Sequence, residues 1–196
     1  MADAFPSYTE ARNTTVTLHA GEILYVPPYW FHRVETAEGQ EVGLSLSVVS
    51  PSRDEMFYSD AYWKLRPFSE EWDSKIRVIA VRQVLEMLFE RLDMGESAPA
   101  FIRRMLLNSR FSQPNVVDAA MRMATPSARE CYGSSRITDP DTLAIFTSAV
   151  ENGTASLRQI SSRGVLALSL GNLIEEMLRY ALGSYNLAAH LDACYS

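Results

Sequence analysis

The pattern of hydrophobic and polar positions changes near residue 50. Residues 14–49 are rich in Val, Thr, Tyr, Leu and Ser and are interrupted by glycines and by Pro27-Pro28, which is typical of short strands joined by turns. From residue 51 onward, apolar residues recur at helical spacing with charged residues between them. The sequence therefore predicts an α+β chain, with a β-rich part over residues 1–52 and a mostly α-helical extension over residues 53–196.

Helices are predicted in the second part wherever the apolar spacing is sustained. The clearest runs over residues 75–92, where one face carries Val78, Val81, Leu85, Leu88 and Leu92. Asp139 and Pro140 are suited to begin a helix, and Gly183 is suited to end one. The stretch from Pro126 to Asp139 is the best candidate for a linker. Together these signals predict further helices over residues 98–108, 114–124, 139–152 and 165–182.

Strict alternation marks the end of the β-rich part, after expected turns at residues 20–22 and 38–40. One face of the expected strand carries apolar side chains and the other small ones, respectively Val42, Leu44, Leu46 and Val48, and Gly43, Ser45 and Ser47. We expect the apolar face to be packed and the small polar face to line a barrel lumen. The alternative for the serines is the exposed polar face of an antiparallel sheet.

His32 is the candidate for chemistry in this part of the chain. It follows the bend at Pro27-Pro28 and the bulky Tyr29, Trp30 and Phe31, which can shield an imidazole from water. Taken alone, such a histidine is more often a structural residue than a metal ligand. The small polar strand that follows it favours a metal ligand, because a lumen of this kind can hold a metal and an organic acid. His19, by contrast, is expected at the surface.

A long ordered motif supports this interpretation. It reads Leu18-x-x-Gly21-Glu22-x-Leu24-Tyr25-Val26-Pro27-x-x-Trp30-x-His32, followed by Gly43-Leu44-Ser45-Leu46-Ser47, and is preceded by Phe5-Pro6-x-Tyr8-x-x-Ala11. The motif resembles the closing half of the Jumonji-C/cupin-like domain of iron(II)/2-oxoglutarate-dependent oxygenases. Within that family it is nearest to the group of the asparaginyl hydroxylase that acts on hypoxia-inducible factor.

The resemblance implies a fold and a role for several residues. The fold is one part of a double-stranded β-helix of the cupin or jelly-roll type. His32 matches the distal histidine of the iron site, and Ser47 and Ser45 fall beside the 2-oxoglutarate cofactor. Tyr29, Trp30 and Gly43 match the pocket wall, and no residue of the chain is assigned as catalytic.

The family also needs residues that the motif lacks. An upstream His-x-Asp or His-x-Glu and an anchor for 2-oxoglutarate should precede residue 5. We therefore expect a fragment of a protein or nucleic-acid hydroxylase or demethylase, which by itself does not retain iron(II) and 2-oxoglutarate. The sequence His190-Leu191-Asp192 has the form of the missing ligand pair, but we interpret it as a coincidence.

One alternative function is a non-catalytic cupin-like interaction module whose helices mediate dimerisation or partner binding. Another is a metal-dependent cupin of different chemistry, such as a sugar isomerase, which needs clustered histidines.

Composition limits the partners and the compartment. A net charge of -6 and a pI near 5.1 give no general attraction to nucleic acid or anionic lipid, and Arg103-Arg104 is too small a basic patch. We expect a protein substrate, a homodimer through the C-terminal helices, and no membrane segment. Cys131 and Cys194 lie far apart in the sequence and are predicted to be reduced thiols in a soluble cytoplasmic or nuclear protein.

Overall fold

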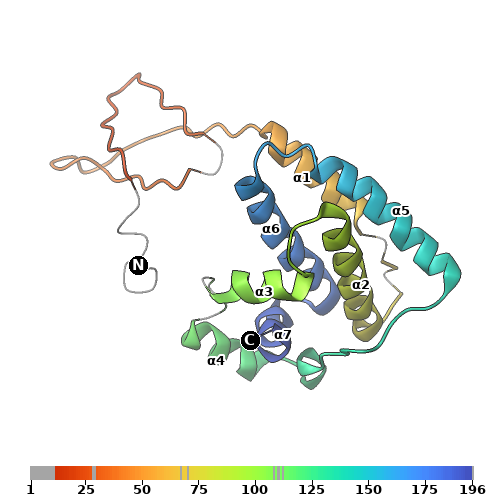
Figure 1. Cartoon of the computed structure of the whole chain (residues 1–196). Coiled ribbons are helices and arrows are strands. Elements are labelled where there is room, and N and C mark those ends of the chain that lie inside the picture. The colour runs from red at the N-terminus through yellow and green to blue at the C-terminus, as the bar shows by residue number, and fades with distance from the viewer. Residues whose placement is uncertain are drawn as a thin grey trace. The chain divides into compact units, whose positions relative to one another are not determined.

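The structure is a computed structural model that describes residues 12–27, 30–66, 68–69, 71–107, 109, 111 and 113–195. The chain divides into two units, residues 1–52 and residues 53–196 (Figure 1). Each unit is described by itself.

The second unit is helical, and each of the five helices predicted from the apolar spacing is present. Its elements are α1 (Arg53–Lys64), α2 (Ser74–Leu92), α3 (Ala98–Leu107), α4 (Pro114–Met123), the 3-10 helix η3 (Pro126–Arg129), α5 (Pro140–Leu157), α6 (Arg163–Leu182) and α7 (Ser184–Tyr195). The bounds of α1 and α7 were not predicted. Helix α5 also continues past Gly153, the residue expected to end it. No helix among the described residues is both long enough and apolar enough to cross a lipid bilayer.

Side-chain and backbone caps fix several helix ends. The carboxylate of Asp139 accepts a hydrogen bond from the backbone N–H of Thr142 at 2.9 Å, and the hydroxyl of Ser162 accepts one from Val165 at 3.1 Å. At the end of α6, the N–H of Gly183 donates to the carbonyl oxygen of Arg179 at 2.8 Å. These bonds satisfy backbone groups that have no partner within the helix. The caps predicted at Asp139 and Gly183 are therefore confirmed.

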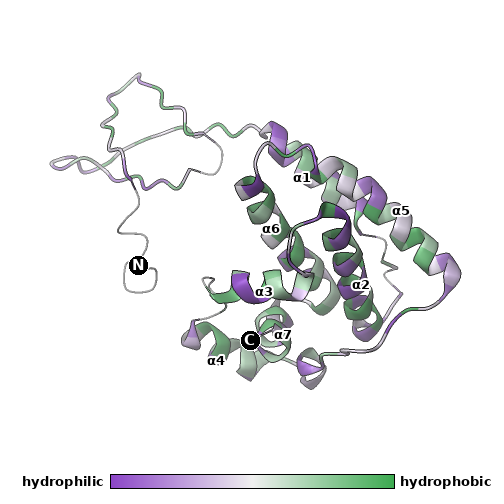
Figure 2. Ribbon diagram, viewed as in Figure 1, coloured by the Kyte–Doolittle hydropathy of each residue, from purple (hydrophilic) through white to green (hydrophobic). Residues whose placement is uncertain are grey.

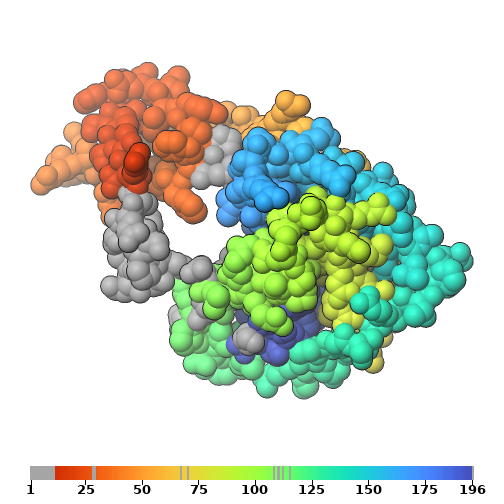
Figure 3. All heavy atoms as spheres, viewed as in Figure 1, coloured from red at the N-terminus to blue at the C-terminus, as the bar shows by residue number. Residues whose placement is uncertain are grey.

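The helices bury one hydrophobic core. Helix α2 packs against α5 and α6, α1 lies along α5, and α7 contacts α4, α6 and η3. In the space-filling view, α3 and α4 cover part of α7 (Figure 3). The apolar faces predicted on α2 and α6 therefore cover each other. The largest fully buried side chains are Leu65, Leu85, Leu88, Ile102, Phe146, Leu157, Leu170, Leu173, Ile174, Met177, Leu178 and Leu191.

The stretch from Pro126 to Asp139 does not connect two domains, because it lies inside the helical unit and is bound to α2. Arg82 donates hydrogen bonds to the carbonyl oxygens of Tyr132 and Gly133, at 2.7 and 2.6 Å. Gln83 bonds Ile137 twice, accepting from its N–H at 2.7 Å and donating to its carbonyl oxygen at 3.1 Å. Two neighbouring polar residues of α2 thus hold the chain between η3 and α5.

The prediction of two reduced thiols is wrong in this structure. Cys131 and Cys194 form a disulfide, with their Cα atoms 5.3 Å apart. The sequence separation of 63 residues concealed the pair. They meet because α7 docks on η3, where Nδ1 of His190 donates a hydrogen bond to the carbonyl oxygen of Ala128 at 2.9 Å.

The first unit contains the predicted turns but not the predicted strands. The N–H of Glu22 donates to the carbonyl oxygen of His19, and that of Gln40 donates to Ala37. Gly21 and Gly39 take positive φ in these turns, as glycine readily does. Among the described residues of 12–52 there is no strand, and Figure 2 draws the segment as a plain trace. The β half of the predicted fold stays a prediction.

The expected packing of the apolar face in residues 42–49 is absent as well. Leu44 and Leu46 are 101% and 91% exposed, and Val42 and Val48 are nearly as open. A strand of this kind is stable only when other strands pair with its edges and a second layer covers its apolar face. The described residues of this unit provide neither, which explains why an alternating sequence remains uncovered.

Candidate functional site

His32 lies on the surface of the first unit. Its side chain is exposed, and Nδ1 lies 3.2 Å from the carbonyl oxygen of Trp30, to which it can donate a hydrogen bond. Trp30 is itself 63% exposed, so it does not shield the imidazole from water. The described residues therefore do not form the expected lumen around His32. They provide neither the partner strands nor the second layer that such a lumen needs.

The other predicted site residues that the structure describes are also exposed. Gly43, Ser45 and Ser47 lie on the chain after the turn at Gly39. A Cβ atom added to Gly43 would come 3.7 Å from the hydroxyl oxygen of Thr36, which places these two residues across that turn from each other. Tyr29, predicted as pocket wall, lies outside the described residues.

The donor set for a metal is incomplete. In the described ranges, no three His, Cys, Asp or Glu side chains gather closely enough to hold a metal ion. His190 of the His190-x-Asp192 pattern is 2% exposed and bonded to Ala128, which makes it a structural residue of the helical unit. The described residues do not assemble an iron(II) site of two imidazoles and one carboxylate, because among them His32 lies in no cluster of potential ligands.

Burial shifts the pKa of four side chains in the helical unit, His190, Tyr58, Tyr132 and Tyr195. The pKa of His190 is lowered, because burial disfavours the charged imidazolium more than the bond to Ala128 favours it. Burial also raises the pKa of Tyr58 to about 12, with Glu176 adding to the effect. The imidazole is therefore neutral and the phenol is protonated near pH 7.

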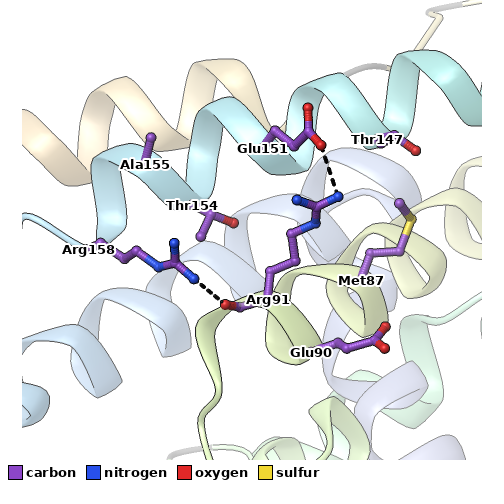
Figure 4. A pocket seen from close by; sticks show the side chains of 8 residues that line it. All are labelled: Met87, Glu90, Arg91, Thr147, Glu151, Thr154, Ala155 and Arg158. Atoms are coloured by element: carbon purple, nitrogen blue, oxygen red, sulfur yellow. Dashed lines mark hydrogen bonds and ion pairs between the residues drawn. The ribbon is translucent and has the colours of Figure 1, made fainter.

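A cavity of about 560 Å³ lies between α2 and α5 in the helical unit, and no pattern in the sequence predicts it (Figure 4). Two arginines of the lining contact other lining residues. The guanidinium of Arg91 lies 2.9 Å from the carboxylate of Glu151, and that of Arg158 donates to the carbonyl oxygen of Arg91 at 2.6 Å. The hydroxyl of Thr154, also in the lining, is buried without a hydrogen-bond partner. These pairs fix the C-terminal end of α2 against α5.

Aromatic rings surround one arginine beside α1 and α6. The guanidinium carbon of Arg66 lies 4.0 Å from the ring centre of Tyr180, and 5.3 and 5.2 Å from those of Tyr62 and Trp63. Such contacts are favourable because the cation meets the negative faces of the rings. These contacts connect the end of α1 to α6. The cation among the rings is Arg66, a residue of the chain itself.

The first unit is similar to one known protein family. Residues 1–49 match the family model described as the cupin-like domain, the segment that contains the turns, His32 and the serines. This match covers a quarter of the chain. No solved structure matches the chain.

Two curated relatives are similar to short stretches of the chain. The HSPB1-associated protein 1 homolog of Danio rerio is 37% identical over 60 residues, which are 31% of this chain and 13% of the relative. The bifunctional peptidase and (3S)-lysyl hydroxylase JMJD7 of Homo sapiens is 46% identical over 35 residues, 18% of this chain and 11% of the relative. The chain thus spans a small part of the length of the relatives it matches. The finer resemblance to the asparaginyl hydroxylase group stays a prediction.

Proposed function

We propose that residues 1–49 belong to an iron(II)/2-oxoglutarate-dependent oxygenase domain and that the whole protein hydroxylates a protein side chain. The observation that supports this most is the cupin-like match over residues 1–49, because it covers the ordered motif that contains His32. The similarity to a relative whose name includes lysyl hydroxylase supports the same class of reaction.

Each proposed role follows from the chemistry of the side chain. A neutral imidazole binds iron(II) well, so His32 would supply one ligand. The hydroxyls of Ser47 and Ser45 can donate hydrogen bonds to a carboxylate of 2-oxoglutarate. Gly43 would leave space in the lumen, and Trp30 and Tyr29 would form its wall.

The remaining ligands would come from a preceding segment of the domain. A single imidazole cannot hold a divalent ion selectively, and no ligand cluster is present among the described residues. Strands from such a segment would also cover the exposed apolar face of residues 42–49. The 196-residue chain alone is therefore expected to show no turnover of 2-oxoglutarate.

The helical unit would serve as an extension that binds a partner or a second copy. The two longest helices, α2 and α6, already cover each other, so any dimer contact must use other surfaces. Among the described residues of this unit, the exposed large apolar side chains are Met56, Trp63, Ile76, Leu107, Met123, Ile145, Leu168 and Tyr185. Sedimentation at several concentrations tests dimerisation, and a clean monomer would dispose of it.

The oxygenase proposal is tested by measuring succinate formed from 2-oxoglutarate. The protein to use is the gene product with any coding sequence that continues upstream in frame. We expect turnover that depends on iron(II), that is abolished in His32→Ala and that is retained in His19→Ala, the matched control. If the two variants behave alike, or if the 196-residue chain turns over as fast as the longer protein, the assignment of His32 is wrong.

The same experiment distinguishes the alternative function. A gene product that starts at residue 1 and binds no iron would be a cupin-like interaction module. In that case the His32→Ala variant should leave every measurable property of the protein unchanged.

A further inference from the structure

The disulfide connects two segments that are also held together by other contacts. Cys131 follows η3 and is exposed, whereas Cys194 lies in the last turn of α7 and is half-buried. An incoming reagent can therefore reach the sulfur of Cys131 more easily. Accessibility is one of the factors that decide which sulfur of a disulfide is attacked.

His190 lies one helical turn before Cys194 and faces the same contact. Its Nδ1 atom is 2.9 Å from the carbonyl oxygen of Ala128 and 3.7 Å from the sulfur of Cys194. Because a carbonyl oxygen only accepts hydrogen bonds, Nδ1 must carry the proton. That N–H can be shared with the sulfur of Cys194, and it would stabilise negative charge developing there.

Contacts other than the disulfide also hold the two segments that contain the sulfurs. Arg82 and Gln83 hold the chain from Tyr132 to Ile137, and His190 holds α7 to Ala128. The sulfur of Cys131 also lies 3.4 Å from the carbonyl oxygen of Ala193, which could accept a hydrogen bond from a thiol at that position. After reduction, the two thiols would therefore remain next to each other and could form the disulfide again.

We propose that Cys131 and Cys194 form a reversible thiol–disulfide exchange site, at which a thiol attacks Cys131 and the sulfur of Cys194 leaves beside the N–H of His190. The thiolate forms a bond to the sulfur of Cys131 while the Cys131–Cys194 bond breaks, and the electron pair stays on Cys194. A second thiolate then attacks the mixed disulfide and releases Cys131. Two thiols are oxidised to one disulfide, and the two cysteines take up two electrons and two protons.

Reduction of the native chain by glutathione tests the attack on Cys131. Samples are quenched with acid, alkylated and mapped by mass spectrometry, while circular dichroism follows the helices. We expect reduction without loss of helix, glutathione on Cys131 at least about tenfold more often than on Cys194, and recovery of the disulfide with oxidised glutathione. Glutathione mainly on Cys194, or reduction only in denaturant, would overturn the proposal.

A second arm distinguishes a monothiol from a dithiol as the reductant. Dithiothreitol resolves its own mixed disulfide and should reduce the pair with no adduct accumulating. If dithiothreitol reduces the pair in the native chain and glutathione does not, the exchange site is specific for dithiols. If neither reagent reduces it, the disulfide is an inert structural bond.

The role of His190 as a positioning residue is tested in the Cys131→Ser variant, where Cys194 is free. Loss of the N–H in His190→Leu should slow alkylation of Cys194 by iodoacetamide about fivefold, and His190→Gln, which keeps an N–H donor, should restore much of the rate. A purely structural role predicts the opposite sign, because loosening α7 would expose Cys194 and speed its alkylation. Faster alkylation of Cys194 in His190→Leu would therefore refute the role of His190 as a positioning residue. The glutathione mapping above needs no variant and stands even if these variants fold poorly.

Discussion

The contact between Gly153 and Leu65 gives the sharpest prediction about the helical unit. Leu65 follows α1 and is fully buried, and it lies directly over Gly153 in the interior of α5. A Cβ atom at residue 153 would lie 2.5 Å from Cγ of Leu65 and 2.8 Å from each of its two methyl carbons. Gly153→Ala therefore forces the whole leucine side chain to move within a close-packed core.

The expected loss of stability follows from two opposing effects. Overpacking of this kind destabilises a core by about 1–3 kcal/mol, and replacing a mid-helix glycine by alanine stabilises by about 1 kcal/mol. Because every atom of the leucine end group lies too close, we expect a cost near the upper limit and a net loss of about 2 kcal/mol. For a unit of this size, the melting temperature should fall by about 4–8 °C.

Gly171→Ala is the matched control. It lies in the interior of α6, and its added Cβ would come 3.2 Å from the sulfur of Met105, a flexible side chain that can shift. This variant gains the same helix propensity without a serious clash, so it should be neutral or more stable by up to about 1 kcal/mol.

Urea unfolding followed by circular dichroism at 222 nm measures both variants. Adding Leu65→Ala to Gly153→Ala should cost less than Leu65→Ala alone, with a coupling energy of about 1–3 kcal/mol, because the alanine at 153 then fills vacated space. Equal stability of the two glycine variants, or additivity in the double variant, would refute the close packing of α1 on α5.

Further predictions concern the C-terminal part and one helix cap. Removing the disulfide by Cys131→Ser should lower the free energy of unfolding by about 4 kcal/mol or less, since it closes a loop of 63 residues; no change in urea unfolding would mean that the pair is open in solution. The pKa of His190 is lowered in the folded chain, so stability should fall as pH drops below the unfolded value near 6.5, and His190→Gln should flatten urea midpoints measured between pH 7 and 5. Ser162→Ala should destabilise by about 1 kcal/mol in the same assay, because it removes the acceptor for the N–H of Val165, and an unchanged midpoint would contradict this.

The helices could be predicted because their signals are local. Apolar spacing and capping residues such as Asp139 and Gly183 act within a few residues of the chain, and the structure confirms them. The extension of α5 past Gly153 could not be predicted, because that glycine reflects the approach of Leu65, a distant residue, and not a helix end. The disulfide depends on how α7 packs on η3, which no spacing of two cysteines reveals.

The geometry of the candidate site, unlike the helices, could not be predicted from local signals. Alternation in residues 42–49 and the motif around His32 predict strands and a lumen, yet both require partner strands that the described residues do not supply. The family of residues 1–49 could be inferred from the motif, since the cupin-like match covers the same segment. The motif does not reveal how the site residues are arranged in space, because a barrel lumen exists only when its sheets are closed.

The metal-binding role of His32 is tested most directly by NMR of the imidazoles of His19, His32 and His190 during titration with Mn²⁺, a paramagnetic substitute for iron(II). In the gene product with any in-frame upstream sequence, the signals of His32 should broaden at substoichiometric Mn²⁺ while those of His19 and His190 stay sharp. If His32 stays sharp while Mn²⁺ binds elsewhere, or if His32 and His19 broaden together only at large excess, residue 32 is not a metal ligand.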